Sequence, residues 1–250
     1  MNPVAIIPAR YASTRLPGKP LLDLGGKPLI QHVVERAREA GIFTRILVAT
    51  DSAAIYEAVV GFGGEAVMTS AQHRSGTERI AEVSRKIEAL CIMNIQGDEP
   101  FVHPQMLVDL WEGFRTEKTA VMGTLRHPLT RYEDVLNPNV VKVVTDEDGY
   151  ALYFSRSPIP HATAASWRER ADAQPPVWYK HIGVYAYRRD FLLQVPLLPR
   201  SALEEVESLE QLRVLAQGFR IRVYTSPWET LGIDTEADLA EARSRWSARK

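Results

Sequence analysis

The chain has 250 residues, of which 45% are hydrophobic and 24% are charged, fractions typical of a globular protein. The 30 basic and 31 acidic residues leave a net charge of −1, which excludes the basic balance of a nucleic-acid-binding or membrane-surface protein. A single cysteine excludes an internal disulfide and a cysteine-based zinc site. The sequence shows no apolar run of membrane-spanning length and no signal-peptide pattern, so we expect a cytoplasmic protein without a membrane partner.

The N-terminal part of the chain alternates short apolar segments with amphipathic ones. The apolar segments predict strands at residues 4–8, 45–50, 65–68 and 90–95. The amphipathic segments predict helices at residues 28–40, from 51 or 52 to 62, and 75–90. Ser75 and Glu78 predict a capping box at the start of the last of these helices. Such an alternation is typical of βαβ units around a parallel sheet that is buried on both faces.

The rest of the chain has a different pattern, with more strands and fewer helices. We predict strands at residues 120–125, 140–145, 151–154, 182–187 and 220–225, one long helix at 201–217, a final helix at 235–247, and a surface loop at 162–177. We therefore predict one α/β domain, 1–250, with a mostly parallel central sheet. Its core comprises residues 1–119 and 216–250, and residues 120–215 form an inserted mixed-sheet lobe.

A basic loop follows the first predicted strand. It spans residues 9–20 and carries Arg10, Arg15 and Lys19 together with the hydroxyl of Ser13. Such a loop can wrap a polyphosphate through charge-assisted hydrogen bonds. It contains neither the P-loop pattern nor the dinucleotide-binding glycine pattern. By itself the loop is equally well explained as a solvated basic surface.

Polar and acidic residues follow other predicted strands. Asp98 and Glu99 come just after the strand at 90–95, and Asp234 follows the strand at 220–225. One or two carboxylates together with phosphate oxygens are the ligands that Mg²⁺ prefers, so we expect a Mg²⁺ site there. Asp234 is also explained as the N-cap of the final helix, and the two roles can coexist. Ser75 is suited to contact a base or a phosphate, although the capping box explains it equally well.

These loops converge because the carboxyl ends of parallel strands share one edge of a sheet. A cationic loop, two separated acids and hydroxyl-bearing loops together indicate nucleotidyl transfer from a nucleoside triphosphate. That reaction needs positioning of the substrates and neutralisation of the triphosphate charge more than it needs covalent chemistry from the protein.

The whole chain resembles the CMP-KDO synthetases, also called 3-deoxy-manno-octulosonate cytidylyltransferases (KDO is 3-deoxy-D-manno-octulosonate). The opening run IIPARYASTRLPGKPL carries the first part of the resemblance, and the combination of SGTER, QGDEP, YFSR and LEQLR makes it specific. Further matching blocks are HRSGTER at 73–79, NIQGDEP at 94–100, NPNVVKVV at 137–144, GYALYFSRSPIP at 149–160, KHIGVYAYR at 180–188, LEQLRVL at 209–215 and GIDT at 232–235. One departure is Glu236, where the family pattern has proline; it affects only the first turn of a helix.

The resemblance implies a Rossmann-like nucleotidyltransferase domain whose core binds the nucleotide. It implies the reaction CTP + KDO → CMP-KDO + pyrophosphate, in lipopolysaccharide biosynthesis, with Mg²⁺ as cofactor. The two substrates would be its small-molecule partners, and the inserted lobe would bind the sugar and form a homodimer.

The resemblance also assigns individual residues. It implies that Arg15, Lys19 and Asp98 are catalytic, and that Asp98 and Asp234 bind the metal. The residues implied to bind the nucleotide are Arg10, Ser13, Arg15, Lys19, Ser75 and Gly76, the last two facing cytosine. The residues implied to bind the sugar acid are Gln96, Arg156, His181, Tyr185, Glu210 and Gln211. The pattern of charges alone favours a solvated helix face for Glu210 and Gln211.

Two other functions remain open at this point. A cytidylyltransferase for another ulosonic acid, such as 8-amino-KDO or sialic acid, would differ only by small changes in the sugar pocket. A non-catalytic nucleotide-binding module would have lost charged residues of the site, yet Arg15, Lys19, Asp98 and Asp234 are all present.

Overall fold

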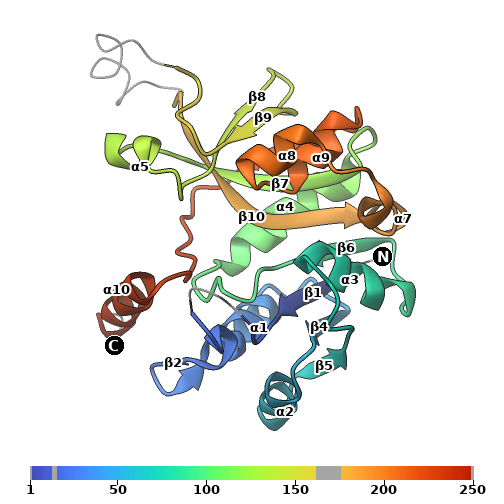
Figure 1. The fold of residues 1–250 in the computed structure, drawn as a ribbon, viewed down its shortest axis with the longest axis vertical. Coiled ribbons are helices and arrows are strands. Elements are labelled where there is room, and N and C mark those ends of the chain that lie inside the picture. The colour runs from blue at the N-terminus through green and yellow to red at the C-terminus, as the bar shows by residue number, and fades with distance from the viewer. Residues whose placement is uncertain (1, 13–15, 162–175, 249–250) are drawn as a thin grey trace. The chain divides into compact units, whose positions relative to one another are not determined.

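The computed structural model describes residues 2–12, 16–161 and 176–248, and the chain forms two compact units. The first comprises Met1–Val108, Ala186–Pro196 and Glu229–Lys250, and the second comprises Asp109–Tyr185 and Leu197–Trp228. Helix α4 (Pro104–Thr116) and strand β10 (Tyr179–Arg188) each contribute residues to both units (Figure 1). The predicted boundaries of core and lobe stay a prediction.

A parallel sheet forms the centre of the first unit. Its strands lie in the order β6 (Cys91–Asn94), β1 (Val4–Ala9), β4 (Arg45–Thr50) and β5 (Glu65–Met68) (Figure 1). The pairs β1–β4, β1–β6 and β4–β5 are all parallel, and the side chains of β6 and most of those of β1 are buried. Loops that follow β1, β4 and β6 therefore leave one edge of this sheet.

Helices and short elements cover this sheet. Helix α1 (Leu29–Glu39) buries Leu29, Val33 and Ala37, which share one face at the helical period. The other elements of the unit are the hairpin β2 (Asp23–Leu24) and β3 (Lys27–Pro28), the helices α2 (Ala53–Gly61), α3 (Gly76–Arg85), α7 (Arg189–Leu192) and α10 (Glu236–Ser247), and the 3₁₀ turn η1 (Lys19–Leu21).

The second unit combines parallel and antiparallel strands. Strand β11 (Ile221–Thr225) runs parallel to β7 (Met122–Pro128), which neighbours β10. Strand β8 (Lys142–Thr145) is antiparallel to both β10 and β9 (Ala151–Ser155). The remaining helices are α5 (Tyr132–Leu136), α8 (Ala202–Glu207) and α9 (Gln211–Ala216), and the turn η2 (Val195–Leu197) leads from the first unit into the second.

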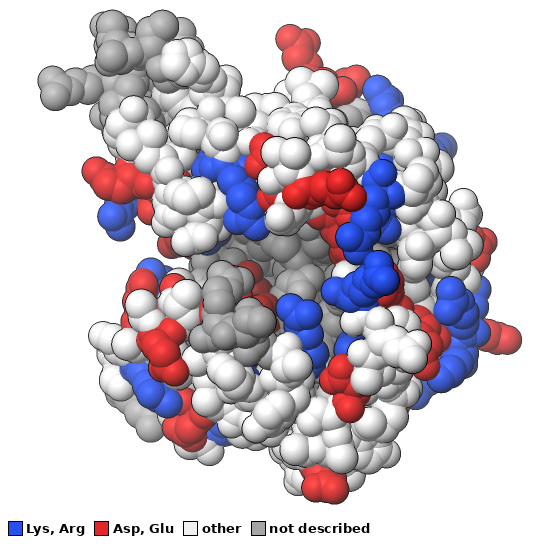
Figure 2. Space-filling view, viewed as in Figure 1, with Lys and Arg blue, Asp and Glu red and all other residues white. Residues whose placement is uncertain are grey.

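The α/β class, with a mostly parallel central sheet and additional antiparallel strands, is therefore confirmed. On the face drawn in Figure 2, basic and acidic side chains are interspersed, as the net charge of −1 suggests. None of the helices formed by the described residues is long and apolar enough to cross a bilayer. The predicted loop at 162–177 falls almost entirely outside the described residues.

The single helix predicted at 201–217 is wrong, because the segment forms two short helices. Ser208 adopts a left-handed conformation with φ 53° and ψ 47°, and the carbonyl of Glu204 accepts N–H bonds from both Ser208 and Leu209. This arrangement closes a helix C-terminus, and it rarely occurs at a residue other than glycine or asparagine. The apolar periodicity runs through the break, so the sequence pattern alone conceals it.

Two further local predictions are corrected. Helix α3 ends at Arg85 rather than at residue 90, because Lys86 closes it with a bond to the carbonyl of Val83 and leaves Leu90 exposed. The predicted capping box at its start is only half formed. The Ser75 hydroxyl accepts from the Glu78 amide, but the Glu78 carboxylate accepts from the amide of Arg74.

A complete capping box stands instead at the start of α10. Its two members are Thr235 and Asp238. Asp234, for which the sequence offered the N-cap position as an alternative, precedes the cap and leaves its carboxylate available for other contacts.

Candidate active site

Three charged side chains meet in the first unit. The ammonium group of Lys19 lies 2.5 Å from an oxygen of Asp98 and 2.9 Å from an oxygen of Asp234. The Lys19 side chain is only 12% exposed, so this contact belongs to the interior of the site rather than to a mobile surface. Two acids far apart in the sequence therefore converge on the Lys19 ammonium, and the Mg²⁺ that they are predicted to share stays a prediction.

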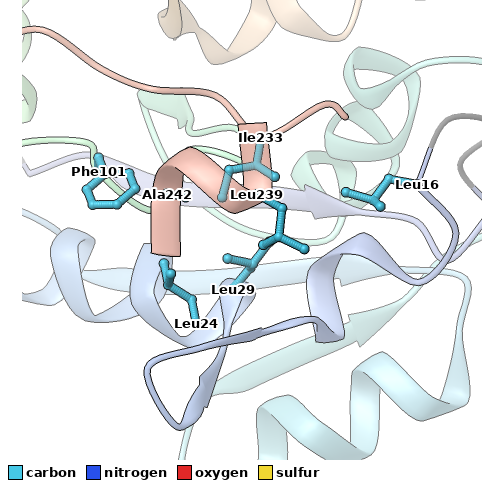
Figure 3. Close-up of a cluster of buried hydrophobic side chains, with 7 residues drawn as sticks. All are labelled: Leu16, Leu24, Leu29, Phe101, Ile233, Leu239 and Ala242. Carbon is cyan, nitrogen blue, oxygen red and sulfur yellow. The ribbon is translucent and has the colours of Figure 1, made fainter. Parts of the chain in front are cut away.

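An apolar cluster holds the segments that carry these groups. Leu16 lies in the basic loop, Phe101 in the loop after β6, and Ile233 directly before Asp234 (Figure 3). The Ile233 amide also donates a 2.9 Å bond to the carbonyl of Asp98. The full cluster consists of Leu16, Leu24, Leu29, Phe101, Ile233, Leu239 and Ala242. Burial of these side chains fixes the backbone beneath the charged groups.

The turn that presents Lys19 needs a particular backbone. Gly18 has φ 67°, a backbone conformation that residues other than glycine rarely adopt. Its amide donates to the carbonyl of Tyr11 at 3.0 Å. On the other side of the site, the Asp234 amide donates to the Asp238 carboxylate at 3.0 Å. Each charged group is thus fixed by its own local structure as well as by the ion pairs.

Lys19 keeps its positive charge in this environment. Burial by itself would lower the pKa of the Lys19 ammonium, but the neighbouring Asp98 and Asp234 carboxylates outweigh it and raise the pKa. A fixed cation between two anions suits a substrate whose phosphates carry the opposite charge.

The residues present fit a magnesium ion. Asp98 and Asp234 place hard carboxylate oxygens within hydrogen-bond distance of one point, and Mg²⁺ commonly takes one or two carboxylates together with phosphate oxygens. Within the described part of the chain, no group of three or more potential metal ligands occurs. The donor set therefore suits an ion shared with a phosphate-bearing substrate rather than a closed protein cage.

The basic loop is only partly described. Arg10 is exposed at the end of β1, where its guanidinium is accessible from solvent. Ser13 and Arg15, which the sequence predicted as nucleotide contacts, lie outside the described residues. Their roles stay a prediction.

Ser75 and Gly76 form the N-terminus of α3. The Ser75 side chain caps the helix, accepting from the Glu78 amide at 3.2 Å. A Cβ atom at Gly76 would lie 3.2 Å from the ring of Pro8 at the end of β1, so only glycine lets the helix approach that closely without strain. The predicted base contacts therefore lie directly beside the end of the first strand.

The loop before α3 is held by a buried arginine, which the sequence analysis did not single out. Arg79 is 3% exposed, and its guanidinium donates to Asp51 at 2.7 Å and to the Thr69 hydroxyl at 2.5 Å. Asp51 therefore ties the end of β4 to α3 and is not a helix cap; Ser52 is the cap of α2.

Glu82, one turn after Arg79 on α3, holds the same loop. The Glu82 carboxylate accepts from the Ser70 amide at 2.9 Å and contacts the His73 ring nitrogen at 2.7 Å. The Ser70 and His73 hydrogen bonds, the largest effects, lower the pKa of Glu82 to about 2. Glu82 and Arg79 together hold the segment from Thr69 to His73, which leads into the predicted base contacts.

Gln96 belongs to the first unit, unlike the other predicted sugar contacts. Its amide nitrogen donates weakly to the Asn94 side chain at 3.4 Å, and its side chain is partly exposed. Gly97 follows it, and a Cβ atom there would lie 2.9 Å from the carbonyl of Pro8. The loop after β6 thus packs against the end of β1.

The other predicted sugar contacts lie in the second unit, where His181, Tyr185 and Glu210 form one group and Gln211 follows Glu210 in the chain. The rings of His181 and Tyr185 have centroids 5.5 Å apart. Burial, with a contribution from Glu210, raises the pKa of Tyr185, which places Glu210 near that phenol. Gln211, the neighbour of Glu210, is 6% exposed and its amide nitrogen has no hydrogen-bond partner among the described residues. Such an orphaned buried donor is suited to an incoming polar group.

His181 is neutral in the folded protein. Burial lowers its pKa to about 3, and Lys180 adds to the effect. Its Nε2 atom lies 3.0 Å from the Thr124 hydroxyl, which itself lies within bonding distance of two backbone carbonyls. Because a hydroxyl has one hydrogen to donate, this geometry makes His181 the donor through Nε2 and leaves Nδ1 as an acceptor.

Arg156, the remaining predicted sugar contact, is anchored by backbone carbonyls. Its guanidinium donates to the carbonyl of Glu207 at 2.8 Å and to that of Pro138 at 3.1 Å. Its own carbonyl accepts from Lys142 at 2.6 Å, and that fully buried lysine also reaches the carbonyl of Asn137 at 3.0 Å. Among the described residues, two of the five guanidinium N–H donors are therefore bonded to backbone carbonyls.

Comparison with known proteins places this architecture in a family. The family model described as "Cytidylyltransferase" matches residues 4–221. The 3-deoxy-manno-octulosonate cytidylyltransferase of Trichlorobacter lovleyi is 49% identical over 98% of this chain and 98% of its own. The enzyme of the same name from Syntrophobacter fumaroxidans is 50% identical over 96% of this chain and 94% of its own.

Solved structures agree with the sequence comparison. A CMP:2-keto-3-deoxy-manno-octonic acid synthetase complexed with CTP has a TM-score of 0.92, is 43% identical, and is covered fully in both chains. A 4-diphosphocytidyl-2C-methyl-D-erythritol synthase from Anaerococcus prevotii has a TM-score of 0.64 at 11% identity and shares the fold alone. The predicted Rossmann-like nucleotidyltransferase fold is confirmed. With near-complete coverage and almost half of the residues identical to curated relatives, the chain belongs to the 3-deoxy-manno-octulosonate cytidylyltransferase family of nucleotidyltransferases.

Proposed function

We propose that this chain transfers the cytidylyl group of CTP to the anomeric hydroxyl of KDO, giving CMP-KDO and pyrophosphate for lipopolysaccharide biosynthesis. The observation that carries the proposal is the convergence of Asp98 and Asp234 on Lys19 at the carboxyl end of a parallel sheet. The names of the curated relatives and the CTP complex of the solved relative support both substrates.

The charged residues of the first unit would handle the triphosphate. We assign Lys19, with Arg10, Ser13 and Arg15, to the phosphate oxygens, where positive charge offsets the charge that builds on the departing pyrophosphate. Asp98 and Asp234 would hold Mg²⁺, which when bound neutralises phosphate charge and orients the α-phosphoryl group. Their fixed backbone allows this without rearrangement of the loops.

Base selection is assigned to the start of α3. The backbone at Ser75 and Gly76 can pair with the amino and carbonyl edges of cytosine, and a purine would need more room there. Turnover of CTP should therefore exceed that of ATP by a wide margin, and equal turnover would contradict the assignment.

The sugar acid is assigned to residues that match its chemistry. KDO carries one carboxylate and several hydroxyls, so it needs one cation and several neutral donors and acceptors. Arg156 supplies the cation, and Gln211 supplies a buried amide whose nitrogen has no hydrogen-bond partner among the described residues. The other residues assigned to the sugar are Gln96, His181, Tyr185 and Glu210.

The decisive experiment is a pyrophosphate-release assay with CTP, Mg²⁺ and a panel of sugar acids comprising KDO, 8-amino-KDO and sialic acid. We expect turnover with KDO that stops on chelation of the metal and returns with added Mg²⁺. The Asp98→Asn variant, which keeps the side-chain shape but loses the charge, serves as the matched control and should lose turnover.

The same assay separates the alternatives. Preference for another acid of the panel would identify a cytidylyltransferase for a different ulosonic acid. CTP binding measured by calorimetry, with no pyrophosphate released from any acid, would identify a non-catalytic nucleotide-binding module.

We further propose that the protein is a cytoplasmic homodimer that associates through its second unit. Leu152 on β9 and Val206 on α8 are 61% and 85% exposed, which supports an apolar surface available for association. Sedimentation of the native chain and of a Val206→Glu variant would test this, and a monomeric native protein would contradict it.

A further inference from the structure

We propose that the short helix α8 carries two positioning residues, Glu204 and Glu207, that set the geometry of the sugar-acid contacts in the second unit. This inference rests on the proposed function, because it concerns the residues to which that function assigns the sugar. Neither acid was singled out by the sequence analysis, in which the segment was predicted to be part of one continuous helix. The structure gives each of them a separate set of contacts.

Glu204 joins α8 to α9 through a buried ion pair. Its two carboxylate oxygens accept from Arg213 at 2.8 Å and 2.5 Å, so the guanidinium and the carboxylate meet side by side. Both residues are less than a tenth exposed, at 7% and 4%. A bidentate pair fixes orientation as well as distance, and in the absence of water it tolerates little movement.

The pair spans the left-handed break at Ser208. The break directs the chain into Leu209 and Glu210, and the first residue of α9 is Gln211. A chain that reverses at one residue can pivot there unless the helices on either side are tied. The Glu204–Arg213 pair supplies that tie, so it sets where Glu210 and Gln211 stand.

Glu207 joins the end of α8 to the end of β9. Its carboxylate accepts from the Ser155 hydroxyl at 2.5 Å and from the Arg156 amide at 2.8 Å. Its backbone carbonyl accepts from the Arg156 guanidinium at 2.8 Å. Glu207 therefore holds both the backbone and the side chain of the residue assigned to the sugar carboxylate.

The two acids lie one helical turn apart and act on different segments. Glu204 controls the start of α9, and Glu207 controls the end of β9, so a single helix sets the spacing between Arg156 and the Glu210–Gln211 pair. Independently, the buried amide nitrogen of Gln211 has no hydrogen-bond partner among the described residues, as expected of a donor that faces a ligand. A substrate with a carboxylate at one end and hydroxyls along its length needs that spacing to be fixed.

The first test changes Glu207 to Gln. The amide keeps the shape but replaces one accepting oxygen by an NH₂ group that faces the Ser155 or Arg156 donor. We expect the KM for the sugar acid to rise about tenfold or more while the KM for CTP stays within about twofold. Glu205→Gln is the matched control, because Glu205 is an exposed acid on the same helix, and its kinetics should equal those of the native chain. Unchanged sugar kinetics in Glu207→Gln would overturn the role of Glu207.

The second test separates positioning from stability at Glu204. Single replacement leaves Arg213 buried without its partner and can unfold the unit, so we use the double variant Glu204→Met/Arg213→Met, since apolar replacement of both partners often preserves stability. We expect a melting temperature near the native value, a CTP KM within about twofold, and a sugar KM raised about tenfold. Native sugar kinetics in the folded double variant would overturn the role of the pair. If it fails to fold, Glu204→Asp, which keeps the charge but shortens the reach, is assayed instead, with the same two outcomes deciding.

Assays of the native chain show whether the proposed function itself fails. If the native chain prefers another acid of the panel, the same variants are assayed with that acid, and the predicted split between the two KM values still applies. If the native chain turns over no sugar acid, the proposed function fails. In that case a loss of direct KDO binding in Glu207→Gln, but not in Glu205→Gln, would support the inference, and its absence would overturn it.

Discussion

Lys19 pairs with two carboxylates in the structure, and in the proposed reaction it would also contact phosphate. In the structure its ammonium lies between Asp98 and Asp234, where burial opposes the charge and the two acids restore it. In the proposed reaction Asp98 and Asp234 would hold Mg²⁺, and Lys19 would contact a phosphate oxygen of CTP. The same side chain would thus offset the charge of two acids in this structure and the charge of the departing pyrophosphate in the reaction.

Replacing Lys19 by Met should therefore lower kcat about 100-fold, because a charge contact made in the transition state is removed. The KM for CTP should change much less. Steady-state pyrophosphate release measures both constants. Lys27→Met is the control, since Lys27 is a surface lysine that is also paired with an acid. An unchanged kcat with a raised KM would mean that Lys19 binds substrate and transition state equally.

Arg156→Lys tests the other end of the reaction. A lysine keeps the charge but loses the planar set of donors, and with it the bonds to the carbonyls of Glu207 and Pro138. We expect turnover with KDO to fall by about tenfold or more while CTP binding, measured by calorimetry, stays within about twofold. Near-native KDO kinetics would show that Arg156 serves only the structure of the unit.

At the scale of elements, α3 shows how one helix can organise a loop. Arg79 and Glu82 project from successive turns and hold the segment from Thr69 to His73. A rigid loop costs less conformational entropy on binding, which favours discrimination between bases.

Replacing Asp51 by Ala should loosen the loop that Arg79 holds before α3. The change leaves the buried Arg79 without its carboxylate, so we expect the free energy of unfolding to fall by about 3 kcal/mol. The KM for CTP should rise as the loop loosens. Urea unfolding and steady-state kinetics measure the two effects. The neighbouring variant Glu57→Ala, at an exposed position on α2, should leave both unchanged.

The elements also show what sequence patterns predict well. Strands β4 and β5 match their predicted bounds, because continuous apolar runs between turn residues have few other solutions. Helix α4 was missed. The α8–α9 break was hidden because an amphipathic pattern gives no sign of a residue in a left-handed conformation. Glu204 and Glu207 were overlooked for a related reason, since acids on a helix read as a solvated face unless their partners are known.

At the scale of the whole molecule, residues close to a strand end were predicted better than residues that act through others. Lys19 and Asp98 follow strands β1 and β6 of one parallel sheet, so the topology brings them to the same edge, and the packing of Ile233 adds Asp234. The grouping of His181, Tyr185 and Glu210 depends on packing within the second unit, which only the family resemblance indicated.

Protonation of His181 on unfolding should make the chain less stable as the pH falls below about 6.5. Its pKa is about 3 in the folded chain and near 6.5 when unfolded, so between these values the unfolded state binds one proton more. Stability that is present above pH 6.5 is therefore lost as the pH falls, at up to about 1.4 kcal/mol per pH unit. Urea unfolding at pH 6.5 and pH 5 should show a loss about 2 kcal/mol larger in the native chain than in His181→Gln. Equal losses in the two proteins would place the His181 pKa near its ordinary value.

The single thiol of the chain, Cys91, can report how often strand β6 opens. Cys91 begins β6, is 5% exposed, and has its pKa raised to about 12 by burial, which outweighs the opposing effects of Arg188 and Tyr187. A thiol reagent attacks the thiolate, so in the closed protein the reaction is suppressed by both access and ionisation. Labelling then requires a transient opening around β6, so its rate measures how often that strand becomes accessible. Because the sequence contains no second cysteine, all labelling comes from Cys91, and the native chain can be used without an engineered probe.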